Sequence, residues 1–61
     1  MTPSEFKAIR SGLDLTQADL ARYLRVSARA VRYDESGDRS IPGPVARLME
    51  IFDQCGGPFW D

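Results

Sequence analysis

The side chains of this sequence best suited to chemistry are arginines, and they gather in its first half. Residues 1–33 carry six basic groups against three acidic ones, a balance of +3, whereas residues 34–61 carry two against six, a balance of −4. Arg29 and Arg32 lie three residues apart, a spacing that puts both side chains on one face of a helix. The chain therefore predicts one basic face that can meet phosphates and one acidic face turned to solvent. The net charge of −1 leaves little unspecific attraction for nucleic acid.

Other kinds of chemistry lack the residues they need. The chain has no histidine, so neither a serine nor its one cysteine, Cys55, has the usual catalytic base. Gly56 and Gly57 precede a proline instead of a helix carrying lysine, so they form no phosphate-binding loop. The acidic residues at 34, 35 and 38 lack the spacing of a calcium loop, and one thiol cannot close a zinc site. We therefore expect no enzyme activity, cofactor, bound metal or small-molecule ligand.

Length and cysteine content restrict the kind of fold. Sixty-one residues make a single domain, residues 1–61, that is marginally stable as a monomer. A lone cysteine permits no internal disulfide, which leaves regular helix packing or self-association to stabilise the chain. No apolar run approaches the roughly 20 residues that span a bilayer, and no signal peptide opens the chain. Together with the unpaired thiol, these features predict a cytoplasmic protein.

Capping signals and apolar spacing predict an all-α fold of four short helices, over about residues 3–11, 16–24, 28–35 and 44–54. The first two helices begin with the threonine and acidic residue of a capping box, Thr2 with Glu5 and Thr16 with Asp19. Ser27 can cap the third. The inward faces are expected to carry Phe6, Ile9 and Leu13; Leu20, Ala21 and Leu24; Ala30, Val31 and Asp34; and Val45, Leu48, Met49 and Phe52. Glycines at 12, 56 and 57 are natural helix stops.

The segment "TQADLARYLRVSARAV", Thr16 to Val31, resembles the helix-turn-helix of the lambda-repressor-like, Cro-type family. The likeness extends through "ESG" and a proline-containing loop and covers about residues 3–54. Its spacing has a physical basis. Ala21 must be small where two helices cross, and Val26 and Val31 fill the angle between them. A compact bundle of four to five helices is the fold that this resemblance implies.

The resemblance also implies a function, the reading of double-stranded DNA in the major groove by a homodimeric, Cro-like repressor on an inverted-repeat operator. The residues implied to contact bases are Ala28, Arg29, Arg32 and Tyr33. Those implied to contact phosphates are Thr16, Gln17, Ser27, Arg39 and Ser40. An arginine early on such a helix can bind guanine bidentately, for about 1–3 kcal/mol of discrimination. Arg10 and Glu35 stand where the family often has a partly buried ion pair.

The sequence departs from the family at several positions. Asp34 replaces a large apolar residue, so we expect either the Tyr33 ring to fold back over the gap or the third helix to fray after residue 32. Arg25 stands where glycine is frequent in the turn, and it is strained there if φ is positive. The chain stops where a fifth helix would begin. Phe59 and Trp60 are therefore expected either to complete the core or to form the dimer interface.

Two other functions remain open. "VSARAVRYDESG" also resembles the reading helix of MerR-type regulators and excisionases, which would require strands after Gly37. The aromatic residues near the C-terminus also suit a protein-interaction module, such as an antitoxin or adaptor. Steep salt dependence of DNA binding would distinguish a DNA-binding protein from an interaction module.

Overall fold

In a computed structural model, which describes residues 1–58, the capping signals and apolar spacing of the sequence give an all-helical fold. Its helices are α1 (Pro3–Gly12), α2 (Gln17–Leu24), α3 (Ala28–Ser36) and α4 (Gly43–Cys55). Each lies within one residue of its predicted bounds, and the predicted fold class is confirmed. Residues 1–58 contain no strand, and α4 occupies the segment in which a MerR-type wing would need strands.

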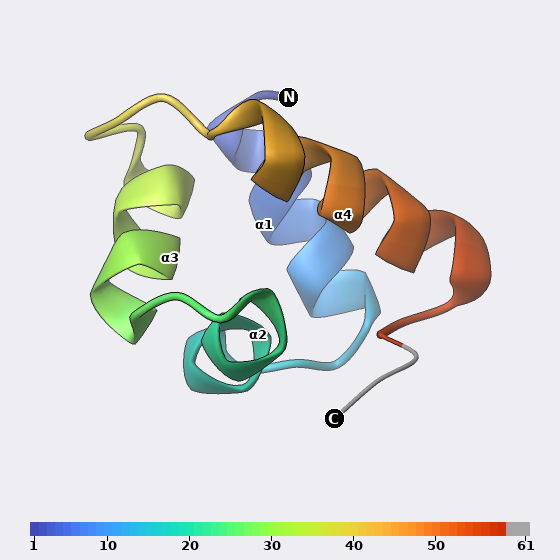
Figure 1. The fold of residues 1–61 in the computed structure, drawn as a ribbon. Helices are drawn as coiled ribbons and strands as arrows, with labels where there is room; N and C mark the ends of the chain where they lie inside the picture. The colour runs from blue at the N-terminus through green and yellow to red at the C-terminus, as the bar shows by residue number, and fades with distance from the viewer. Residues whose placement is uncertain (59–61) are drawn as a thin grey trace.

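Helix α1 is central to the arrangement, because it packs against both α3 and α4 (Figure 1). Helices α1 and α4 run side by side, α2 crosses below them, and α3 stands at the edge of the molecule against α2 and α1. No helix within residues 1–58 has the length and apolar character needed to cross a bilayer.

Local hydrogen bonds start the helices as predicted. The hydroxyls of Thr2 and Thr16 accept the backbone N–H groups of Glu5 and Asp19 at 3.1 and 3.0 Å, and each carboxylate accepts the N–H of its threonine in return. The hydrogen bonds that Glu5 accepts from the Thr2 side chain and backbone lower its pKa, and those that Asp19 accepts from the Thr16 backbone and side chain lower its pKa. Ser27 Oγ likewise accepts the N–H of Ala30 at 3.1 Å. Satisfying the unpaired amides of the first turn fixes where each helix begins.

The core draws apolar side chains from all four helices: Phe6, Leu20, Ala21, Leu24, Val31, Met49 and Phe52. All were predicted to face inward. Of the remaining residues on the predicted inward faces, the apolar ones are half-buried around this cluster. Each large buried side chain contributes about 1.5–3 kcal/mol of transfer free energy, so this small cluster supplies most of what stabilises the domain.

The helix ends differ in how they use the left-handed backbone region. Glycines end α3 and α4 as C-caps at Gly37 (φ 84°) and Gly56 (φ 81°). Helix α1 ends at Gly12 as predicted, but the left-handed residue after it is Asp14 (φ 61°). Helix α2 ends at Arg25 with φ 61° and ψ 41°, so the strain anticipated for a non-glycine residue there is present.

Candidate nucleic-acid interface

Helices α2 and α3 form a helix–turn–helix unit joined by residues 25–27 (Figure 1). Ala21 and Leu24 of α2 and Val31 of α3 are buried between the two helices and the rest of the core. The turn is closed by the backbone N–H of Val26, which donates to the carbonyl of Ala21 at 3.0 Å. Packing this tight leaves α3 a fixed inner side and a free outer side.

The outer side of α3 is exposed and basic. Ala28, Arg29, Arg32 and Tyr33 are all exposed, whereas Val31 and Asp34 face inward. Within residues 1–58, the guanidinium groups of Arg29 and Arg32 form no hydrogen bond or ion pair. They can therefore approach an anion or a base edge without breaking an existing interaction. The four residues implied to read bases share this surface.

The phosphate-binding candidates at the helix starts are partly engaged. Thr16 and Ser27 are exposed, and their hydroxyl oxygens accept capping bonds. The Thr16 side chain also hydrogen bonds to the Asp19 carboxylate, whereas within residues 1–58 the O–H proton of Ser27 stays available to a phosphate. The first N–H groups of α2 and α3 are likewise unpaired by the helices themselves. The Gln17 side chain is half-buried and donates from Nε2 to Glu35 Oε1 at 3.1 Å, so its amide is engaged within the protein.

An ion pair between Arg10 and Glu35 holds α1 to α3, which confirms the predicted pairing. Arg10 donates to Glu35 from Nε and from Nη2, the latter at 3.2 Å, and from Nη1 to the carbonyl of Leu15 at 2.7 Å. The side chains are 15% and 6% exposed. With Gln17 on the same carboxylate, the pair fixes the start of α2 beside the last turn of α3.

A second ion pair, between Asp34 and Arg39, corrects the expectation for Tyr33 and Asp34. Helix α3 continues to Ser36, and the Tyr33 side chain remains 38% exposed, so the helix does not fray and the ring does not cover the gap. Asp34 itself fills the buried position, at 1% exposure. Arg39 neutralises it, donating from Nε to Oδ1 at 2.7 Å and from Nη2 to Oδ2 at 3.4 Å.

This pairing could be suspected from an acidic residue at an inward helical position and an arginine five residues later. The spacing alone does not reveal that the loop turns back over α3. The hydrogen bonds that Arg39 donates to the Asp34 carboxylate raise the pKa of Arg39, which therefore stays charged. The Arg39 side chain is 41% exposed although the carboxylate that it pairs with is buried, so the pair joins the interior to the surface.

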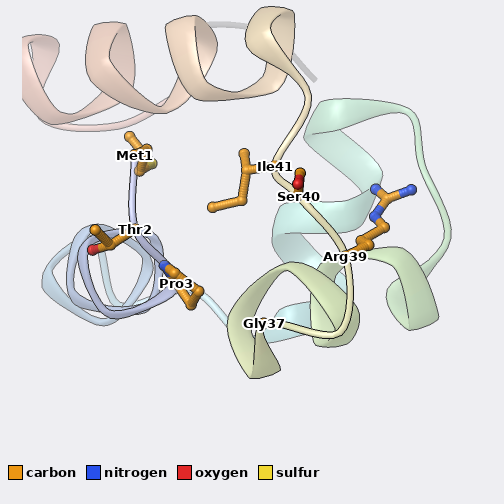
Figure 2. Close-up of a pocket in the computed structure, with 7 residues that line it drawn as sticks. All are labelled: Met1, Thr2, Pro3, Gly37, Arg39, Ser40 and Ile41. Carbon is orange, nitrogen blue, oxygen red and sulfur yellow. The ribbon is translucent and has the colours of Figure 1, made fainter.

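Ser40 and Arg39 belong to the loop between α3 and α4, beside a groove of about 400 Å³. The groove lies between this loop and the N-terminal segment and is lined by Met1, Thr2, Pro3, Gly37, Arg39, Ser40 and Ile41 (Figure 2). Figure 2 shows the Ile41 side chain reaching into this space and the Arg39 guanidinium pointing away from it. Arg39 is thus directed out of the groove, toward the Asp34 pairing.

Arg25 is a basic residue of this region to which the sequence reasoning gave no DNA contact. It is exposed, lies in the turn before α3, and makes no side-chain hydrogen bond or ion pair with any other residue of the described range.

Phe59 and Trp60, the candidates for the dimer interface, lie outside the described residues. Among residues 1–58, no three metal-ligating side chains converge. No family model, curated protein or solved structure matches this chain.

Proposed function

We propose that this protein is a sequence-specific, double-stranded DNA-binding transcriptional regulator of the Cro-like kind. The observation that supports this most directly is the outer side of α3, where Arg29 and Arg32 are exposed and unpaired within residues 1–58. Three other arginines already face a carboxylate, in the pairs Arg10–Glu35, Arg39–Asp34 and Arg47–Glu50. The outer side of α3 thus carries unpaired positive charge, although the whole chain has a net charge of −1.

A protruding helix of this kind suits the major groove, which is about 12 Å wide and admits one α-helix. In this docking Arg29 binds the O6 and N7 atoms of a guanine, and Arg32 and Tyr33 extend the contact along α3. Ala28 is small enough to touch a thymine methyl group. The hydroxyls and amides at the starts of α2 and α3 contact the flanking phosphates.

We further propose that two copies bind an inverted repeat, with half-sites about 34 Å apart, and repress by excluding polymerase from the operator. Phe59 and Trp60 are the proposed dimer contacts. The protein would act in the cytoplasm, where the exposed thiol of Cys55 stays reduced.

Selection of bound sequences from a random duplex pool tests the proposal. The wild type should recover a symmetric motif, and log affinity should fall steeply with log salt. Arg29→Ala should lose preference at one base position in each half-site, a change of about 1–3 kcal/mol.

Arg47→Ala is the matched control, because it removes one exposed arginine from α4 and should leave the preference unchanged. Absence of binding to any duplex at low salt would contradict the proposal and favour a protein-interaction module. Retained preference in Arg29→Ala would mean that α3 is not the reading helix.

A further inference from the structure

We propose that Asp34 is a positioning residue for DNA binding, which holds Arg39 so that the free edge of its guanidinium binds a backbone phosphate. This inference rests on the proposed function and adds to it a residue that makes no DNA contact itself. Stability alone explains the buried Asp34 carboxylate poorly. A carboxylate at 1% exposure occupies a position where an apolar side chain would fill the core. Replacing buried charges by apolar groups is often neutral or stabilising, so the carboxylate needs another reason to be there.

The geometry of the pair supplies that reason. A guanidinium has five N–H donors arranged in two forks. Asp34 takes the fork made by Nε and Nη2, at 2.7 and 3.4 Å. The other fork, made by Nη1 and the second Nη2 proton, remains unused within residues 1–58. The side chain is 41% exposed, so this second fork is accessible for a bidentate bond to a phosphate.

The position of Arg39 fits a phosphate contact. Gln17 and Glu35 are hydrogen bonded at 3.1 Å, so the start of α2 lies beside the last turn of α3. The loop carrying Arg39 leaves from that same turn, after Gly37. Arg39 and the α2 start, with its Thr16 hydroxyl, therefore flank one end of α3, while Ala28 and Arg29 occupy the other end. A guanidinium fixed beside the groove-facing helix loses less conformational freedom on binding than a free arginine does.

The test compares two variants for which loss of negative charge and loss of Arg39 positioning predict opposite changes in DNA affinity. Asp34→Asn and Asp38→Asn each remove one negative charge near the same loop. Asp38 is exposed and accepts a bond from Ser36 that asparagine can also accept, so it is the matched control. If charge alone matters, both variants bind a selected duplex more tightly than the wild type. If Asp34 positions Arg39, Asp34→Asn instead binds about tenfold more weakly, while Asp38→Asn binds more tightly.

Two further variants separate positioning from folding. Asp34→Leu should keep the fold, since the half-exposed Arg39 can be hydrated, yet it should lose affinity as Asp34→Asn does. Arg39→Ala should weaken binding and reduce the slope of log affinity against log salt by about one phosphate contact. Adding Asp34→Asn to Arg39→Ala should weaken binding no further, because Asp34 acts through Arg39. All affinities are measured below the melting temperature of each variant, as followed by circular dichroism.

Tighter binding by Asp34→Asn, or an equal loss of affinity in the Arg39→Ala background, would overturn the inference. If the wild type binds duplex with an Arg29-dependent preference while Asp34→Asn binds more tightly, the inference alone fails. If the wild type binds no duplex, the proposed function fails with it.

Discussion

Asp34 and Glu35, consecutive carboxylates near the end of α3, are each paired with an arginine, but the two pairs join different elements of the fold. Glu35 meets Arg10 from α1, 25 residues earlier in the chain, and also accepts a hydrogen bond from Gln17 at the start of α2. Asp34 meets Arg39, five residues later, in the loop that follows the same helix. One pair ties three helices together, and the other ties a loop to the helix that it leaves.

The two pairs also differ in depth. In the first, both side chains are largely buried, at 15% and 6% exposure. In the second, Asp34 is buried at 1% while Arg39 is 41% exposed. Removing either partner of the first pair leaves a charge without water or a counter-charge. In the second pair, only loss of the arginine does so. The first pair should therefore respond symmetrically to mutation and the second asymmetrically.

The largest effect is expected for Glu35→Ala. This change leaves the buried Arg10 guanidinium without a counter-charge, with only the Leu15 carbonyl as a partner, and also releases Gln17, so it should cost about 3–5 kcal/mol. A domain of this size has a total stability of about 3–9 kcal/mol, so most of its margin would be lost. Urea and thermal denaturation followed by circular dichroism measure the change. Arg10→Ala should behave similarly.

The control for this effect is Glu50→Ala, which breaks the Arg47–Glu50 pair on α4. Both of its side chains are more than half exposed, at 67% and 52%, and they are 3.5 Å apart. The free energy of unfolding should change by less than about 1 kcal/mol. A loss as large as that of Glu35→Ala would show that burial is not what separates the pairs.

An intermediate and unequal effect is expected for the second pair. Asp34→Leu should melt at or above the wild-type temperature, because it replaces a buried charge by an apolar side chain and leaves Arg39 within reach of water. Arg39→Ala should lower the melting temperature, because it leaves Asp34 buried and unpaired. Equal losses in the two variants, measured by thermal denaturation, would contradict the asymmetry.

The smallest effect is expected for the carboxylates of the two capping boxes, Glu5 and Asp19. The pKa of Glu5 is lowered by the hydrogen bonds that it accepts from the Thr2 side chain and backbone, and that of Asp19 by those from the Thr16 backbone and side chain. A lowered pKa in the folded state means that the ionised carboxylate stabilises the fold above the unfolded-state pKa. This contribution is lost as the pH falls through the folded-state pKa.

The melting temperature should therefore decline in the acidic range, at and below the usual pKa values of glutamate and aspartate. The double variant Glu5→Gln/Asp19→Asn should decline less steeply over that range than the wild type does. An unchanged acid profile in this variant would show that the two capping carboxylates do not cause the decline.

Much of this architecture is predictable from the sequence because its signals are local. Thr2 lies three residues before Glu5, and Thr16 three before Asp19, so the helix starts follow from spacing alone. The Arg10–Glu35 pair spans 25 residues and became predictable only through the family resemblance.

The Asp34–Arg39 pair was not predicted, because it depends on the path that the loop takes after Gly37. The same dependence made the expectation for the Tyr33 ring wrong. In the proposed function, the contacts of the exposed α3 side chains depend on how the helix docks on DNA, which spacing and burial do not determine. Those roles therefore stay predictions.

The left-handed backbone at Arg25 makes the turn between α2 and α3 a permissive place for sequence change. Glycine would relieve the strain there and β-branched residues would increase it, but other unbranched side chains pay a conformational penalty similar to that of arginine. Once glycine has been given up, one exposed side chain can replace another at little further cost. Replacing Arg25 by another unbranched side chain, such as glutamine, changes the charge beside the N-terminus of α3 without a new backbone penalty. The charge carried by this turn is thus separable from the packing that positions α3.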